Sequence, residues 1–350
     1  MRHILSIIFA LVVLSTPISH SCASDKPLLF MNTALLITEI QQATDSIQIA
    51  TYSAYLKDLW SSHDPIIEAL EKAQRRGVDV SIQWNGFHIN SNQNQAMLKK
   101  QSTEAKWCQY KHFTCSFPSQ TNAYYHRKFM IIDNHVAFIM TGNFPWKVCS
   151  SLHPSKQSCL INYSWRITSP QMINSLNSIF QDDRIPSALK HIQPKSNLPN
   201  NLIVSPNDDH YAMFIQNTQS SLNVMQPFLN TWIPFTITNP LKDRLKKGIS
   251  VRILTNQLPG PKKISNELLK LQKKYPTLLQ IRLSKPSVFI HAKVMIRDQS
   301  SVIAGSINWS DWSLHHNREI DLIDDTPSNI KFALKQFNTL WQQADRITVD

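Results

Sequence analysis

The stretch YHRKFMIID at residues 125–133 recurs as IHAKVMIRD at residues 290–298. Counted from the histidine, each copy has lysine at +2, aspartate at +7, a hydroxyl residue at +15 and asparagine at +17. A purely structural repeat keeps its apolar positions, whereas this one keeps histidine, lysine and asparagine. The chain therefore contains an internal duplication that preserves chemical groups. The matched pairs are His126 and His291, Lys128 and Lys293, Asp133 and Asp298, Thr141 and Ser306, and Asn143 and Asn308.

The spacing places the repeated histidine and lysine on one face of a strand, because successive side chains of a strand alternate between faces. If the two copies face each other, two imidazoles, two ammonium groups and two asparagine amides surround one site. Such a site suits a phosphodiester: the lysines neutralise its non-bridging oxygens and the amides add fixed donors. One histidine attacks phosphorus in line while the other protonates the leaving group.

The repeated aspartates lie an odd number of residues from the histidine and the lysine of their own copy. We therefore expect Asp133 and Asp298 on the opposite face or at the strand end. Their predicted role is structural, in the turns Asp133-Asn134 and Asp298-Gln299. The hydroxyl residues Thr141 and Ser306 are expected to support the site.

The surroundings of each copy repeat as well. Each half shows an apolar-alternating strand, an amphipathic helix that ends near a glycine, and a second strand. These elements are predicted at 46–51, 65–75 and 78–82 in the first half, and at 221–225, 240–247 and 249–254 in the second. This order predicts an α/β architecture in which helices cover a mixed sheet. We expect one lobe at residues 25–192, a linker containing proline and asparagine at 193–209, and a second lobe at 210–350.

The pattern H-x-K-x4-D, followed by a hydroxyl residue and asparagine, resembles the signature of the phospholipase D superfamily in both copies. The resemblance implies two α-β-α sandwich lobes, one site at their pseudo-twofold interface, no metal or other cofactor, and a phosphohistidine intermediate. It assigns catalysis to His126, Lys128, Asn143, His291, Lys293 and Asn308. Members of the superfamily include phospholipases, phospholipid synthases, nucleases and tyrosyl-DNA phosphodiesterases, so the motif identifies the chemistry and not the substrate.

One further catalytic residue, Glu319, resembles the carboxylate with which the superfamily binds a catalytic histidine. Glu319 lies in the stretch Asn317-Arg318-Glu319-Ile320. In the first half, the matching stretch Asn162-Tyr163-Ser164-Trp165 has Ser164 at that place. We therefore predict that Glu319 binds His291 and that His126 has no carboxylate partner. A carboxylate favours the imidazolium form, which would make His291 the general acid and His126 the nucleophile. The alternative is that the half without a carboxylate has lost activity.

The N-terminus predicts export. Arg2 and His3 precede an apolar run at residues 4–14, and small residues follow at 21–24, which is typical of a secretory signal peptide over residues 1–24. An uncleaved N-terminal anchor is the alternative. Export predicts a periplasmic, secreted or cell-surface protein, in which the four later cysteines form disulfides rather than free thiols. The local pairing, Cys108 with Cys115 and Cys149 with Cys159, is one of three arrangements.

The formal net charge of +12 favours an anionic partner, although a basic surface also serves solubility. We predict a monomer that hydrolyses or transfers the phosphatidyl group of phospholipids and contacts a membrane surface. The alternatives are a secreted metal-independent nuclease and a catalytically idle relative that binds lipid or nucleic acid. The aromatics Phe144, Trp146, Trp309 and Trp312 either line the mouth of the site or pack between the lobes.

Overall fold

The computed structural model of the chain describes most of both predicted lobes. The described residues are 27–52, 59–60, 64–86, 95–118, 123–145, 159–184, 198–206, 209–229, 233–256 and 264–347. The predicted signal peptide, Cys149 and Trp146 lie outside these ranges, so export remains a prediction. Within the described ranges, none of the helices combines the length and the apolarity needed to span a bilayer.

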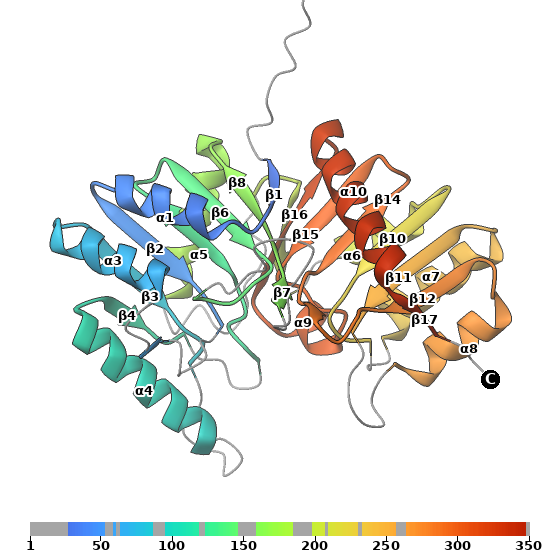
Figure 1. Ribbon diagram of the computed structural model, residues 1–350, viewed down its shortest axis with the longest axis horizontal. Coiled ribbons are helices and arrows are strands. Elements are labelled where there is room, and N and C mark those ends of the chain that lie inside the picture. The colour runs from blue at the N-terminus through green and yellow to red at the C-terminus, as the bar shows by residue number, and fades with distance from the viewer. Residues whose placement is uncertain are drawn as a thin grey trace, which may run out of the picture.

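Two mixed sheets, one from each half of the chain, form two lobes that lie side by side (Figure 1). The first sheet has the order β1-β8-β6-β5-β2-β3-β4, and the second has the order β17-β12-β11-β10-β14-β15-β16-β9. The run β8-β6-β5-β2-β3-β4 corresponds to β16-β15-β14-β10-β11-β12, which confirms the duplicated α/β fold. The strands of the first sheet are β1 (Leu28–Phe30), β2 (Ser46–Ala50), β3 (Asp79–Gln83), β4 (Thr114–Ser116), β5 (Phe129–Ile132), β6 (Val136–Met140) and β8 (Tyr163–Ile167). Those of the second are β9 (Leu202–Ser205), β10 (Ser221–Met225), β11 (Ser250–Thr255), β12 (Leu279–Leu283), β14 (Val294–Arg297), β15 (Ser301–Gly305), β16 (Glu319–Asp324) and β17 (Asp345–Arg346).

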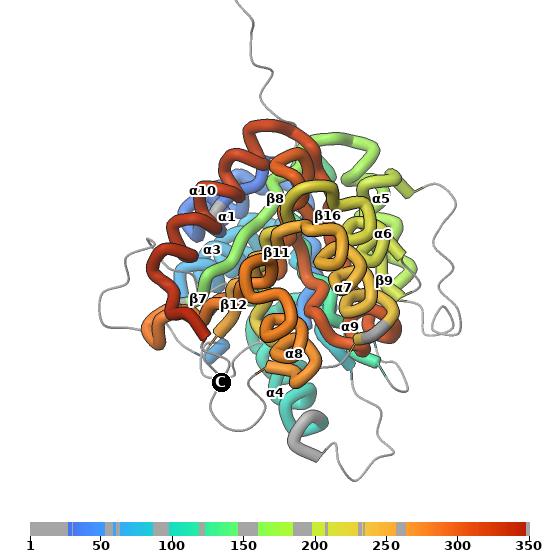
Figure 2. The backbone as a smooth tube through the Cα atoms, turned by 90° about the vertical axis from the view of Figure 1, so that its right-hand side faces the viewer, coloured from blue at the N-terminus to red at the C-terminus, as the bar shows by residue number. Residues whose placement is uncertain are grey.

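Helices cover the sheets on both faces. In the second lobe, α10 lies on one side of the sheet and α6 and α7 lie on the other (Figure 2). The helices of the first half are α1 (Thr33–Gln42), α3 (Pro65–Arg75), α4 (Gln95–Lys111) and α5 (Pro170–Asp183). Those of the second half are α6 (His210–Gln216), the π-helical turn η3 (Pro234–Thr238), α7 (Asn239–Lys246), α8 (Asn266–Lys274), α9 (Asp311–His315) and α10 (Pro327–Gln343).

The predicted strand–helix–strand unit is confirmed in both halves, as β2, α3 and β3 and as β10, α7 and β11. The start of α3 shows why. The carboxylate of Asp64 accepts hydrogen bonds from the backbone N–H groups of Ile66 and Ile67, at 3.0 and 3.2 Å. Proline suits the first helical position because no N–H partner is needed there. At the other end, Gly77 adopts a φ of +95°, in the left-handed region that terminates helices.

The predicted linker at residues 193–209 contains a strand. Residues Leu202–Ser205, inside the range predicted to be a linker, form strand β9. This strand pairs with β16 in antiparallel register, from Glu319 opposite Ser205 to Leu202 opposite Leu322. Its four residues, Leu-Ile-Val-Ser, are buried, so an apolar run decided the structure over the neighbouring proline and asparagine residues. The second sheet therefore begins earlier in the chain than predicted.

The two lobes share a hydrophobic core that fixes their relative position. This core contains Trp165 and Phe180 of the first lobe together with Ile320 and Phe337 of the second. The indole N–H of Trp165 also donates to the carbonyl oxygen of Ala304 across the boundary, at 2.8 Å. In addition, β7 (Cys159–Ile161) pairs in parallel with β13 (Val288–Ile290), so that backbone from both halves joins in one ladder. A site built from both lobes can therefore be held rigidly.

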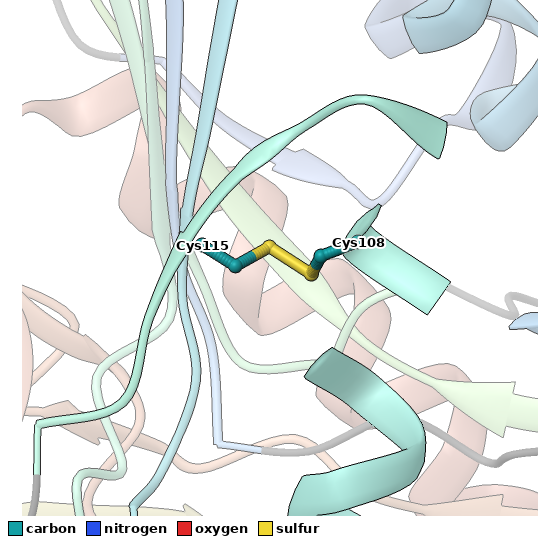
Figure 3. The surroundings of a disulfide bond; sticks show 2 residues. All are labelled: Cys108 and Cys115. Atoms are coloured by element: carbon teal, nitrogen blue, oxygen red, sulfur yellow. A yellow bond between two sulfur atoms is a disulfide. The ribbon is translucent and has the colours of Figure 1, made fainter. Parts of the chain in front are cut away.

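Cys108, near the end of α4, and Cys115, in β4, form a disulfide, with their Cα atoms 6.2 Å apart (Figure 3). One of the two predicted local pairs is thus confirmed. The second pair includes Cys149, outside the described residues, and stays a prediction. The disulfide ties the helix before β4 to the edge of the first sheet.

Candidate active site

The two motif histidines lie where the lobes meet, each on a segment that hydrogen-bonds to the other lobe. The backbone N–H of His126 donates to the carbonyl oxygen of Arg318 at 2.9 Å, and that of His291 donates to the carbonyl oxygen of Ile161 at 3.1 Å. The chain then continues into β5 after the first motif and into β14 after the second. His126 is therefore placed beside Glu319, which follows Arg318. His291 is placed beside Asn162, which follows Ile161.

For His126 that residue is Glu319. Its Oε2 atom lies 2.6 Å from His126 Nδ1, with the carboxylate fully buried and the imidazole 12% exposed. A carboxylate only accepts hydrogen bonds, so Nδ1 carries the proton and Nε2 keeps its lone pair. Burial lowers the pKa of His126 to about 4, although Glu319 acts in the opposite direction. The imidazole is therefore neutral near pH 7, with Nε2 available as a nucleophile.

For His291 the corresponding neighbour is Asn162, whose Oδ1 atom lies 3.0 Å from His291 Nδ1. The hydroxyl of Thr141 donates to the same oxygen at 3.0 Å, which identifies it as the acceptor atom of the amide. Burial holds the pKa of His291 well below its ordinary value, and the positive charges of Lys293 and Lys128 lower it further. His291 thus binds a proton weakly.

The prediction that Glu319 binds His291 and that His126 lacks a carboxylate is wrong. The partners cross between lobes because the motif segments pair with the opposite lobe. The proposed match of Ser164 to Glu319 is also off by two residues. Hydrogen bonds from Tyr163 N to Thr141 Oγ1 and from Ile320 N to Ser306 Oγ, both 2.9 Å, align the halves. Asn162 therefore corresponds to Glu319, and Ser164 corresponds to Asp321.

Both motif lysines are fully buried in this site. Lys128 Nζ donates to the carbonyl oxygen of His126 at 2.9 Å, and Lys293 Nζ donates to that of His291 at 2.6 Å. Lys293 Nζ also donates to the carbonyl oxygen of Thr141 in the first lobe, at 3.2 Å. Burial lowers the pKa of Lys128 to about 7, with Glu319 acting against the shift. The charge of Lys293 acts on His126 and that of Lys128 acts on His291, so all four groups share one site.

Asn143 and Asn308 stand on matching loops after β6 and β15. The loop backbone is held alike in both halves: Phe144 N donates to Thr51 Oγ1 at 3.2 Å, and Trp309 N donates to Gln226 Oε1 at 3.1 Å. The Oδ1 atoms of both asparagines are buried, and no donor among the described residues bonds them. Both amides thus keep unused hydrogen-bonding capacity at equivalent positions of the two halves.

The motif aspartates lie away from the histidines, in turns with positive φ at Asp133 and Asp298. The Asp133 carboxylate accepts hydrogen bonds from the backbone N–H groups of Thr44, Asp45 and Ser46, at 2.8 to 2.9 Å. The Asp298 carboxylate does the same for residues 219–221, at 2.7 to 3.0 Å. Partial burial opposes ionisation, but these hydrogen bonds lower the pKa of both carboxyls. The aspartates fasten the start of the first strand of each unit to the end of the motif strand.

Asn85 and Asn256 are positioning residues that sequence reasoning missed. The Oδ1 atom of Asn85 accepts a hydrogen bond from Tyr125 N, directly before His126. Asn256 Oδ1 accepts from Ile290 N at 2.7 Å, directly before His291, and its Nδ2 donates to the Ile290 carbonyl oxygen at 2.8 Å. Both asparagines follow the second strand of their strand–helix–strand unit. That repeated position in the two halves was a usable signal in the sequence.

A buried ionic cluster also joins the lobes beneath the site. Asp183 of α5 accepts hydrogen bonds from Arg127 Nε and from Arg318 Nη1, each at 2.6 Å. Arg127 also donates to the carbonyl oxygen of Glu319 at 2.6 Å. All three charged side chains are buried, so removing one would leave an uncompensated charge. The cluster fixes the backbone on both sides of Glu319 relative to the first motif.

Asp321, the counterpart of Ser164, is a second buried carboxyl of the second lobe. It accepts hydrogen bonds from Tyr211 Oη at 2.6 Å and from Ile307 N at 3.0 Å. Burial raises its pKa to about 7. The second lobe thus supplies both buried carboxyls, Glu319 and Asp321, that act on the two motif lysines.

This raised pKa predicts a pH-dependent stability. The folded protein keeps the proton of Asp321 up to about pH 7, whereas the unfolded chain releases it near pH 4. Stability from this group is therefore present at low pH and is lost as pH rises through that window. Between about pH 5 and pH 7 we expect wild-type protein to lose at least about 1 kcal/mol of unfolding free energy relative to Asp321→Asn. Urea unfolding measured across pH, with exposed Asp243→Asn as the control, checks this; a pH-independent difference would contradict it.

The aromatic residues beside the asparagines divide between the two roles considered. Each lobe also has a hydrophobic core of its own, separate from the core that the lobes share. Phe144 is buried in that of the first lobe and Trp309 in that of the second, so neither forms a mouth of the site. Trp312, on α9 next to the boundary between the lobes, is 49% exposed. In the part of the chain that the structure describes, no three His, Cys, Asp or Glu side chains are grouped to hold a metal ion.

Comparison with known proteins gives the following matches. A family model described as "Cardiolipin synthase, PLD-like domain" matches residues 36–184 and 211–341, which takes in both lobes. The mitochondrial cardiolipin hydrolase of Homo sapiens is 31% identical over 65 residues, which are 19% of this chain and 26% of that protein. The Xenopus tropicalis protein of the same name is 33% identical over 70 residues, 20% of this chain and 33% of its own. The aligned region thus spans a third or less of these relatives.

Two solved structures share the whole fold. Phosphatidylserine synthase from Haemophilus influenzae Rd KW20 superposes with a TM-score of 0.65 at 15% identity, covering 92% of this chain and 87% of that one. Polyphosphate kinase from Porphyromonas gingivalis superposes with a TM-score of 0.60 at 12% identity, covering 93% of this chain and 48% of that one. At these identities the likeness concerns the fold alone.

Proposed function

Because the chain belongs to the cardiolipin synthase family of phospholipase D-like domains, we propose that it cleaves or transfers the phosphatidyl group of a phospholipid. The reaction passes through a phosphohistidine on His126. Membership of the phospholipase D superfamily, predicted from the two motifs, is thereby confirmed. Membership of the family does not fix the substrate, so the phospholipid substrate is part of the proposal.

The observation that carries the proposed reaction is the 2.6 Å contact between Glu319 and His126 in a site that also holds both lysines. The lysines bind the non-bridging oxygens of the diester. His126 Nε2 attacks phosphorus, and the imidazole gains positive charge as the N–P bond forms. The buried carboxylate stabilises that charge.

His291 completes the reaction. Its neutral partner, Asn162, leaves it a weak base and hence a strong acid, so a proton on His291 passes readily to the leaving alcohol as the P–O bond breaks. The negative diester supports that proton while it is bound. In the second step His291 takes a proton from water or an acceptor alcohol, whose oxygen displaces His126 from phosphorus. The original roles, His126 as nucleophile and His291 as general acid, are thus proposed again, for a different reason.

The family description and the name of the matched hydrolases support a lipid substrate over nucleic acid, and export, if it occurs as predicted, agrees with it. The test is incubation of purified protein with vesicles of cardiolipin, phosphatidylglycerol or phosphatidylcholine, and separately with plasmid DNA. We expect phosphatidic acid from vesicles, a phosphatidyl ester of added glycerol if transfer occurs, and no product with His126→Asn. Cleavage of DNA without phospholipid turnover would favour the nuclease alternative.

We further propose that the protein is exported and acts as a monomer. The disulfide between Cys108 and Cys115 supports an oxidising compartment. N-terminal sequencing of protein recovered from expressing cells tests the cleavage expected before Asp25. Material that retains residues 1–24 would contradict cleavage.

Activity is expected to survive chelation. Two lysines and two asparagine amides occupy the places where metal-dependent phosphodiesterases put carboxylates. Turnover in excess EDTA should therefore match turnover in chelator-free buffer. A loss on chelation that added divalent ions reverse would contradict the proposed role of the lysines.

A further inference from the structure

Each catalytic histidine has an aromatic residue two positions before it, Tyr124 before His126 and Phe289 before His291. Residues two apart in an extended segment point to the same side, so each ring lies toward its histidine. A second ring joins each of these, and the two pairs flank the site from opposite lobes. The pairs differ in chemistry.

Beside His291 the two rings are phenylalanines. The centroid of Phe289 lies 6.5 Å from that of His291, and Phe228 contacts Phe289 edge-on with centroids 6.4 Å apart. Phe228 follows β10 and is 37% exposed, so it reaches solvent at the edge of the site. These two rings offer hydrocarbon surface and carry no hydroxyl.

Beside His126 the two rings are tyrosines. The Tyr52 centroid lies 4.9 Å from that of His126 and 5.5 Å from that of Tyr124, edge-on in both cases. Lys128 Nζ lies 6.0 Å from the Tyr52 centroid. Burial raises the pKa of Tyr52 to about 12, so its hydroxyl stays protonated. This side offers hydroxyl groups next to the nucleophile.

We infer that Phe228 and Phe289 form the subsite for the leaving alcohol, and that this subsite selects an apolar carbon skeleton over a small polyol. The side of phosphorus on which the alcohol leaves rests on the proposed function, in which His126 is the nucleophile. In an in-line displacement by His126, the leaving oxygen lies on the far side of phosphorus, where His291 protonates it. An alcohol leaving there contacts the phenylalanine pair. A diester whose phosphate joins two apolar groups is then a better substrate than one with a polar head group.

Two stable analogues test this without turnover. In both, a methylene replaces the leaving oxygen of a phosphonate methyl ester: one carries a phenethyl group and the other a 3,4-dihydroxybutyl group. Calorimetry on wild-type protein should show tighter binding of the phenethyl compound. Phe289→Ala and Phe228→Ala should each weaken that compound about fivefold, since a ring contact is worth about 1 kcal/mol, and should leave the diol compound nearly unchanged.

Matched controls locate the bound group. Tyr124→Ala removes the counterpart ring beside His126, and Phe235→Ala removes an 82% exposed phenylalanine on η3. Both should leave the preference for the phenethyl compound intact. If Tyr124→Ala abolishes the preference while the Phe228 and Phe289 variants keep it, the assignment of sides is overturned. Equal affinity of wild-type protein for the two compounds overturns the subsite. Failure to release phosphatidic acid from vesicles would contradict the proposed function alone.

Discussion

Replacing Glu319 with glutamine is expected to lower kcat/KM about a hundred- to a thousandfold, the usual cost of removing a group that stabilises transition-state charge. Glu319 Oε2 lies 2.6 Å from His126 Nδ1 and is the carboxylate in contact with the proposed nucleophile. Glutamine keeps the shape but loses the charge that stabilises the imidazolium formed with the N–P bond. Steady-state kinetics on a soluble diester measure the loss.

The control is the matching position of the other lobe. Asn162→Asp places a carboxylate beside His291, which should raise the pKa of His291 and make it a weaker acid. This variant should lose activity mainly with poor leaving groups. Glu319→Asp, which restores charge at a greater distance, should recover part of the loss, and thermal unfolding shows whether each variant is folded. Glu319→Gln with kcat/KM within about threefold of wild type would contradict the role given to the carboxylate.

Replacing His291 with alanine is expected to separate substrates by their leaving groups. With a poor leaving group such as an alkyl alcohol, turnover should fall about 10³-fold or more, because general acid catalysis commonly contributes up to about 10⁴-fold. With an activated leaving group such as p-nitrophenol, which needs little protonation, formation of the intermediate should be far less affected. The same histidine activates the water that breaks the intermediate down, so phosphohistidine should accumulate.

Stopped-flow measurement of released nitrophenolate checks this prediction. Wild-type protein should turn over steadily, and His291→Ala should give a burst followed by a slow phase. The matched variant His126→Ala should give neither a burst nor a slow phase above background. Equal losses for both leaving groups in His291→Ala, without a burst, would contradict its role as the acid.

Local sequence patterns predicted the units of this fold. The strand–helix–strand units follow from apolar alternation, a proline at the helix start and a glycine after its end, all of which act within a few residues. The turns at Asp133 and Asp298 were also predicted, because the parity of their spacing removes them from the catalytic face. In these cases the deciding interactions are close in sequence.

The partners of the histidines could not be predicted in the same way. His126 meets Glu319 because a backbone hydrogen bond joins it to Arg318, in a ladder between lobes that apolar alternation does not specify. Matching the halves by their shared asparagines, Asn162 and Asn317, misplaced the register by two residues. The hydroxyl bonds of Thr141 and Ser306 define the true register, and they exist only in the folded protein.

Peptide mapping shows which histidine carries the phosphoryl intermediate, which we assign to His126. Protein is mixed with a diester of an activated leaving group whose retained group is isotopically labelled, then quenched in alkali and digested, because phosphohistidine is labile in acid. We expect label on the peptide containing His126 in wild-type protein, more of it in His291→Ala, and none in His126→Ala. Label on the peptide containing His291 in wild-type protein, or turnover without label in any variant, would contradict it.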